Sequence, residues 1–217
     1  MVNAGDNIRQ LAQRRKRQAI GKFALAGVLI AVPLLPYSIL GLTSISVFIC
    51  VTCWVGGVVQ AQKGQKLLLS SRRANKGAAA EESTALILQE LEREGWVIEY
   101  NVPLKGWGDA DAFVCSPNSN YFVIDTKSNN GTVFFDGTRL MLRYGKNIYS
   151  FSNDKDILKA VRGQAVLLKE IKKVNFVVPI LCFTEANLDI KKTDSKVENV
   201  YVLKYSSLVK MLRQLDK

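Results

Sequence analysis

The longest apolar stretch of the chain lies near its N-terminus. Residues 23–62 include no charged side chain, whereas about 20 apolar residues are enough for one membrane-spanning helix. Pro33 and Pro36 predict a break near the middle of this stretch, so we expect a transmembrane helical hairpin formed by residues 23–40 and 44–62. A cleaved signal peptide and a single proline-kinked span are the alternatives.

The hydrophobic pattern of the remaining chain predicts a mixed α/β domain. Helical patterns cover residues 78–94, 154–173 and 206–215. Strand patterns cover residues 96–104, 111–115, 121–127, 132–135, 140–143, 175–183 and 199–203. This order of elements is typical of an α/β layout with a mixed central sheet flanked by helices.

Composition and charge divide the chain into four parts. We expect a basic arm (1–22), the apolar hairpin (23–62), a basic linker (63–76) and a folded domain (77–217). The formal net charge is +11, and residues 1–76 contain 11 Lys and Arg but one acid, so they carry +10 of it. Because these basic residues flank an apolar segment, they predict that both termini lie on the cytoplasmic side of a membrane rather than a general affinity for nucleic acid.

Two residue types limit the chemistry that the chain can perform. The sequence contains no histidine, which excludes Ser-His-Asp and Cys-His catalysis and any zinc site with a histidine ligand. Cys50 and Cys53 lie in the apolar segment, and Cys115 and Cys182 lie in predicted strands. This spacing does not suggest disulfides, so we expect a reduced domain that faces the cytosol.

Two predicted neighbouring strands carry acidic residues. Side chains alternate across a strand, so Asp125 and Lys127 share one face of the buried strand 121–127. Burying either charge without a partner is costly, and a bound divalent cation together with a phosphate would offset that cost. A turn at residues 116–120 would bring Asp111, at the start of the preceding strand, close to Asp125.

The predicted helices supply two further candidates. Glu81 lies on the same helical face as Ala85 and Leu88, so it points toward the core; a simple interaction with the helix dipole is the alternative. Gln164 lies within the apolar stripe of the helix 154–173, where a buried amide needs a partner. We expect it to reach a phosphate, a water molecule or Lys127, or else to reach solvent from the edge of the stripe.

Together these segments resemble the nuclease-related domain (NERD) of the PD-(D/E)XK nuclease superfamily. The resemblance extends from about Lys76 to past Gln164. It rests on Gly77-x-x-Ala80-Glu81, Gly108-Asp-Ala-Asp111-Ala-Phe-Val, Phe122-Val-Ile-Asp125-Thr-Lys127, Asn130-Gly131 and Gln164. The chain departs from the pattern at Asp125, where the family usually has Glu, and at Ala80, where many relatives have Gly.

The resemblance implies a restriction-endonuclease-like fold and hydrolysis of phosphodiester bonds with Mg²⁺ or Mn²⁺. It implies Asp111 and Asp125 as metal ligands, Lys127 as the cation near the attacked phosphate, and Glu81 and Gln164 as supporting residues. Such an ion activates a bound water without histidine.

We therefore expect a nuclease-like protein that acts on nucleic acid, with DNA as the expected substrate. Residues 23–62 would contact the lipid bilayer of the cell (inner) membrane, and the domain would lie in the cytoplasm. The alternative is a non-catalytic module of the same fold that binds nucleic acid or a protein partner at the membrane.

Overall fold

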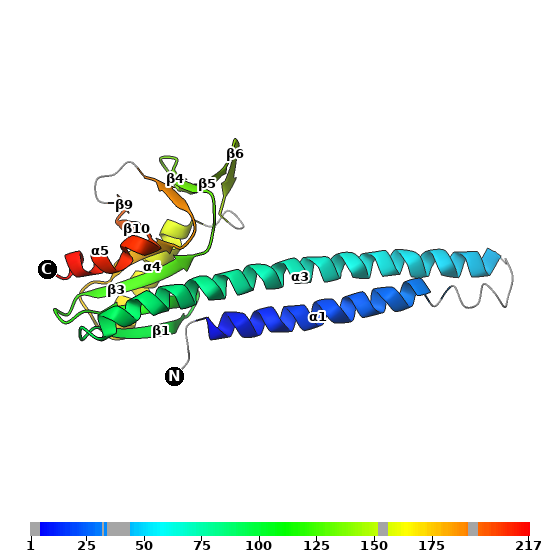
Figure 1. Ribbon diagram of the computed structural model, residues 1–217, viewed down its shortest axis with the longest axis horizontal. Helices are drawn as coiled ribbons and strands as arrows, with labels where there is room; N and C mark the ends of the chain where they lie inside the picture. The colour runs from blue at the N-terminus through cyan, green and yellow to red at the C-terminus, as the bar shows by residue number, and fades with distance from the viewer. Residues whose placement is uncertain (1–4, 32, 34–43, 152–155, 191–194) are drawn as a thin grey trace. The chain divides into compact units, whose positions relative to one another are not determined.

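The computed structural model describes residues 5–31, 33, 44–151, 156–190 and 195–217 (Figure 1). The chain divides into two compact units. The first comprises Asn7–Lys76, and the second comprises Gly77–Lys217 together with the residues up to Asp6.

The first unit is a pair of helices, formed by α1 (Asp6–Ala31) and the N-terminal part of α3 (Ser44–Glu92). The Ser71 hydroxyl donates to the Ala12 carbonyl oxygen over 2.7 Å, and the Trp54 indole N–H donates to the Ile30 carbonyl oxygen over 3.3 Å. These contacts show that the two helices run antiparallel. Small residues at seven-residue intervals let the backbones approach closely: Ala12, Ala19 and Ala26 on α1, and Gly57, Gly64 and Ser71 on α3.

The expected transmembrane hairpin of residues 23–40 and 44–62 is not supported. No helix in the described part of the chain combines the length and the apolar character needed to cross a membrane. The expected turn between the two spans falls largely on residues 34–43, outside the described ranges.

The expected basic linker of residues 63–76 is helical. It forms part of α3, which continues without interruption from Ser44 to Glu92. The segment contains no proline, and leucine, lysine, arginine, glutamine and alanine dominate it, all residues that favour a helix. Polarity alone suggested a linker here, although a polar segment can continue a helix when nothing in it stops one.

The second unit is built on a six-stranded mixed sheet with the strand order β1-β2-β3-β7-β10-β9. Strands β1, β2 and β3 pair antiparallel, whereas β3, β7 and β10 pair parallel. The bounds of the strands are Val97–Leu104 for β1, Gly108–Cys115 for β2, Tyr121–Lys127 for β3, Val178–Phe183 for β7, Lys196–Val197 for β9 and Val200–Lys204 for β10.

A second sheet of four strands has the order β6-β5-β4-β8. The hairpin β4–β5 lies around Asp136-Gly137, where the sequence predicts it, because Gly137 takes the positive φ of 109° that such a turn needs. The bounds are Thr132–Phe135 for β4, Leu140–Tyr144 for β5, Asn147–Ser150 for β6 and Asn187–Asp189 for β8.

Helices cover both faces of the six-stranded sheet, so the expected mixed α/β class is confirmed. On one face, α4 (Ile157–Lys172) packs on residues such as Val123, Leu181 and Phe183. On the other face, the last turns of α3 and helix α5 (Leu208–Leu215), which follows a 3₁₀ turn at Tyr205–Ser207, pack on residues such as Phe122 and Ile180. This arrangement buries β3 on both faces. It also holds in place the C-terminal end of β3, where Asp125 and Lys127 lie.

Candidate active site

The candidate site lies where strands β2 and β3 stop pairing. Their register pairs Ala112 with Ile124, and one further step would set Asp111 beside Asp125. At this step Asp111 instead accepts a hydrogen bond from the Thr126 backbone N–H through Oδ2 over 2.5 Å. The Asp111 carboxylate therefore takes the place of a backbone acceptor.

A local reversal of the backbone accompanies this divergence. The register of β1 pairs Tyr100 with Ala112 and Val102 with Ala110, so Asn101 lies across from Asp111. Asn101 has a φ of 54°, in the left-handed region that asparagine tolerates better than most residues. Ala110 and Ala112 pack into the cores on opposite faces of the sheet, although simple alternation would put them on the same face. The alternation of side chains between the two faces of the sheet is therefore interrupted at Asp111.

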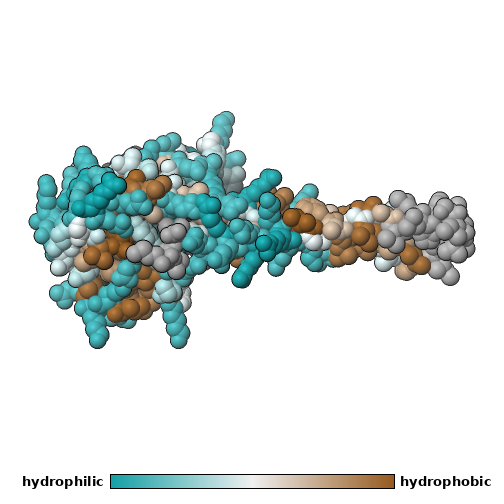
Figure 2. Space-filling view, turned by 60° about the horizontal axis from the view of Figure 1, so that its bottom comes forward, coloured by the Kyte–Doolittle hydropathy of each residue, from teal (hydrophilic) through white to brown (hydrophobic). Residues whose placement is uncertain are grey.

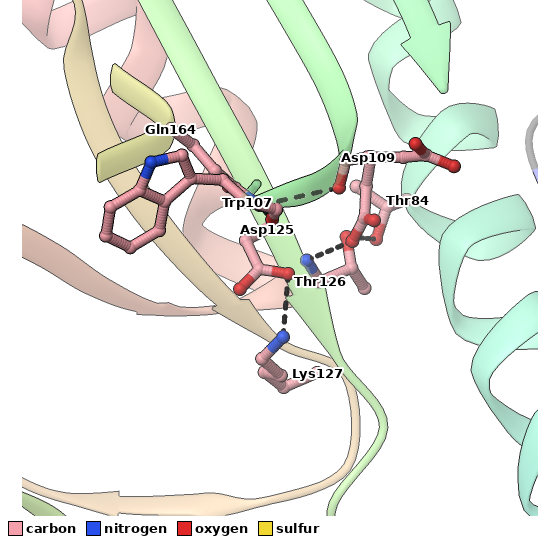
Figure 3. A network of polar contacts seen from close by, with 8 residues as sticks. Thr84, Trp107, Asp109, Asp125, Thr126, Lys127 and Gln164 are labelled. Carbon is pink, nitrogen blue, oxygen red and sulfur yellow. Dashed lines mark hydrogen bonds and ion pairs between the residues drawn. The ribbon is translucent and has the colours of Figure 1, made fainter. Parts of the chain in front are cut away.

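Asp125 and Lys127 lie at the end of β3 and form an ion pair. The Lys127 Nζ donates to Asp125 Oδ1 over 2.7 Å (Figure 3). Asp125 is buried, whereas the Lys127 side chain remains 26% exposed. Burial by itself would lower the pKa of Lys127, but the nearby carboxylates of Asp125 and Asp111 outweigh it, and its pKa is raised. Lys127 therefore stays charged.

Glu81 reaches this group from helix α3. One turn further along that helix, the Thr84 hydroxyl accepts a hydrogen bond from the Thr126 hydroxyl over 3.3 Å, so α3 packs against the end of β3. Glu81 is 7% exposed. Burial, followed by the charge of Asp125, raises the pKa of Glu81 to about 7. The core-facing orientation expected from the helical spacing of Glu81 is confirmed.

Negative charge dominates the cluster. Burial, then the charges of Asp125 and Glu81, raise the pKa of Asp111 well above its usual range. Asp109 adds a further charge that Glu81 senses. Three carboxylates that repel one another beside a single ammonium group would all be stabilised in their charged forms by a divalent cation. Within the described residues, no group of three or more acidic or cysteine side chains meets the geometry of a complete metal site.

Gln164 lies beside this cluster, and its amide nitrogen has backbone partners that were not expected from the sequence. It is 5% exposed in the middle of α4, and its Nε2 lies 3.4 Å from the carbonyl oxygens of Trp107 and of Asp109, to both of which it donates. Its Oε1 is buried and has no partner among the described residues. Gln164 thus holds the backbone that leads into Asp111, rather than contacting Lys127.

Three residues of the site were not expected from the sequence. Asp109 precedes Asp111 by two positions, a spacing that could have marked it, whereas Thr84 carries no such signal. Trp107 lies in the turn between β1 and β2, flanked by Gly106 and Gly108 with positive φ values of 85° and 77°. An aromatic residue framed by two glycines in a tight turn could have been noticed.

One of three comparisons with known proteins found a match. The family model described as the nuclease-related domain matches residues 76–184, which is half of the chain. The match covers every residue of the candidate site. The comparisons with curated proteins and with solved structures gave no match. On the strength of the family match, the chain belongs to the nuclease-related domain family.

Proposed function

We propose that the second unit hydrolyses phosphodiester bonds in nucleic acid, with DNA as the expected substrate and a divalent cation as cofactor. The observation that carries the proposal is the gathering of Glu81, Asp111 and Asp125 around Lys127 in a largely buried position. A merely structural ion pair requires one carboxylate and one ammonium group. Burial and then the charge of Asp125 raise the pKa values of both additional carboxylates, Glu81 and Asp111, which costs stability unless a ligand compensates for it.

The donor set suits Mg²⁺ or Mn²⁺. Mg²⁺ is usually held by one or two carboxylates, and water and phosphate oxygens complete its coordination. Asp111 and Asp125 would hold the ion, so a complete protein cage is not required. When bound, such an ion polarises the phosphate and lowers the pKa of a bound water toward neutrality.

The protein's own groups have separable tasks in this reaction. Lys127 carries a permanent positive charge and is partly exposed, so it can turn from Asp125 to a phosphate oxygen and offset the charge that develops there. Glu81 is a carboxylate close to Asp125 and Lys127, where it can accept a proton from a water molecule at the site. Gln164 positions the turn before Asp111.

Cleavage assays with the full chain test the proposal. The protein is incubated with single-stranded DNA, duplex DNA and RNA in Mg²⁺, in Mn²⁺ and in excess chelator. We expect cleavage that requires metal and that falls at least about 100-fold in Asp125→Asn and Lys127→Met, because both groups act at the reacting phosphate. The matched controls are Glu99→Gln and Lys172→Met, which break an exposed ion pair of 2.6 Å. Cleavage that survives chelation, or that Asp125→Asn leaves intact, would refute the proposal.

A non-catalytic module is the second candidate. It is favoured by the shorter reach of the Asp125 side chain, compared with the Glu that the family usually has at this position. This version predicts nucleic-acid binding that weakens steeply with salt, without turnover.

Location at the cytoplasmic face of the cell membrane is a separate proposal. Apolar side chains gather over part of the first unit (Figure 2). Fractionation of cells that express the full chain, with a carbonate wash, tests it: recovery only in the soluble fraction would refute it. Near the start of α3, the exposed large apolar residues are Val47, Phe48, Ile49, Val51, Trp54, Val55, Val58 and Val59.

A further inference from the structure

An exposed tryptophan lies at the same end of the sheet as the carboxylates. Trp107 is 41% exposed. Because β2 runs antiparallel to β3, the turn that precedes β2 lies at the end of the sheet where β3 reaches Lys127. Figure 3 shows the indole of Trp107 and helix α3 on opposite sides of Asp125. An aromatic surface is therefore available next to the candidate site, on the side away from helix α3.

Helix α4 holds Trp107 in position. A Cβ atom at Gly163 would lie 2.6 Å from each of three atoms of the six-membered indole ring, so the ring rests directly on the backbone of α4. Gln164 holds the carbonyl oxygen of Trp107 itself. A ring that is held in place while part of its surface remains exposed can bind a flat partner with little loss of side-chain entropy.

Two tyrosines extend from the second sheet toward the same end. Tyr144 on β5 and Tyr149 on β6 are 37% and 50% exposed, and their rings meet edge to face with centroids 5.8 Å apart. The Tyr144 hydroxyl donates to Asn130 Oδ1 over 3.1 Å, and a Cβ at Gly131 would lie 2.8 Å from the Tyr144 ring. The pair thus rests on the loop that begins directly after Lys127.

Tyr144 and Tyr149 lie on the face of the second sheet that carries the buried residue Leu142. The register pairs Tyr149 with Leu142, which is buried, so the two side chains share one face of the sheet. Tyr144 lies two residues beyond Leu142 and shares that face as well. Their rings therefore project past the edge of the core rather than into it. Exposed lysines lie in the adjoining turns, Lys105 before Trp107 and Lys146 after Tyr144.

We propose that this site takes unpaired nucleotides, whose bases stack on Trp107 and on the Tyr144–Tyr149 pair while Lys105 and Lys146 contact the phosphates. The bases of a duplex are already stacked on one another, so flat aromatic surfaces favour single strands or frayed ends. This inference rests on the proposed function, because it names the substrate class of the same site.

Binding measurements on the full chain test the inference separately from cleavage. The Asp125→Asn variant is titrated, in Mg²⁺, with a labelled single-stranded oligonucleotide and with a blunt duplex of the same sequence. We expect the single strand to bind at least 10-fold more tightly. Trp107→Ala should weaken single-strand binding by about 5- to 150-fold, and Tyr149→Ala should weaken it in the same direction, whereas Trp107→Phe should retain most of it.

Two further measurements make the test specific. In a Trp54→Phe background only Trp96, which is buried, and Trp107 emit, so stacking should quench the fluorescence of Trp107 as the single strand saturates the site. The matched control is Phe176→Ala, which removes an aromatic side chain that is 64% exposed and precedes β7, at the opposite end of the sheet. That variant should bind as the parent does.

The possible results separate the two proposals. Cleavage of single strand and duplex at equal rates, unchanged by Trp107→Ala, would overturn the inference and leave the nuclease proposal standing. Single-strand binding with quenching of Trp107, but without cleavage in the parent protein, would support the stacking surface and overturn the nuclease proposal. If neither polymer binds and only a protein partner is captured, both are overturned.

Discussion

Gly163→Ala provides the sharpest test of how Trp107 is positioned. The new methyl group would lie 2.6 Å from three ring atoms of Trp107, whereas unstrained carbon contacts lie at about 3.5–4.0 Å. The ring must therefore move away from α4 by about 1 Å. Since the ring is partly exposed, it can move without disturbing the core.

The same substitution should not weaken the fold. Alanine is favoured over glycine in the interior of a helix by about 1 kcal/mol, which opposes the cost of displacing the indole. We expect the free energy of unfolding in urea to stay within about 1 kcal/mol of the parent, and single-strand affinity to fall as far as it does in Trp107→Ala. Gly77→Ala is the matched control, since nothing lies within 4 Å of its Cβ position in helix α3, and it should affect stability alone.

A double mutant completes this test. If the effect of Gly163→Ala on binding acts through the indole, Trp107→Ala should abolish it, so the two changes will not be additive. The reasoning is refuted if Gly163→Ala leaves both tryptophan fluorescence and single-strand affinity unchanged while Trp107→Ala lowers that affinity. It is also refuted if Gly163→Ala destabilises the Trp107→Ala protein, because the methyl group would then meet something other than the ring.

Three further predictions concern stability and are checked by urea unfolding. In metal-free protein the pKa of Glu81 is about 7 rather than 4.5, so the folded state binds more protons than the unfolded state between these values. The free energy of unfolding should thus fall, by at most about 3 kcal/mol, as pH rises from 4.5 to 7; Glu81→Gln should flatten this slope, and a rise would contradict the assignment. Gly131→Ala should destabilise the protein by more than about 1 kcal/mol, because φ is 88° and the new Cβ would lie 2.8 Å from the Arg143 carbonyl oxygen. Phe183→Ala should cost about 3–5 kcal/mol, since that ring is fully buried; a cost below 1 kcal/mol would show that the core around it is loose.

Local patterns predicted the elements that bury a continuous apolar face. The strands around Asp125 and Val133 begin and end where the sequence predicts them, because short apolar runs bounded by turn formers leave little freedom. Strands β6, β8 and β9 escaped prediction because each has only two to four residues, too few to show a pattern. Strand β8 also forms by pairing with β4, which is distant in sequence.

The candidate site could be predicted only in part from the sequence. The proximity of Asp111 and Asp125 follows from a turn and from strand alternation, both of which are local. Two other features of the site are not local, because they depend on how α4 and β1 pack against β2. They are the reversal of β2 at Asp111 and the contact between Gln164 and the Trp107 carbonyl group. The seven-residue spacing of Ala12, Ala19 and Ala26 indicates close helix pairing. It was overlooked because the composition divided these residues between a basic arm, which includes Ala12 and Ala19, and an apolar segment, which includes Ala26.

The hydrogen bond that Asp111 accepts from Thr126 depends on the shape of the Asp111 side chain, whereas the proposed metal binding depends on its charge. That bond requires an oxygen acceptor but no charge, and the amide of an asparagine would supply one of nearly the same shape. A single base change in a codon converts Asp to Asn, so a descendant of this protein could lose hydrolysis in one step and keep its strand end intact. If the chain hydrolyses nucleic acid as we propose, its conversion into a protein that only binds nucleic acid would not require the loss of this hydrogen bond.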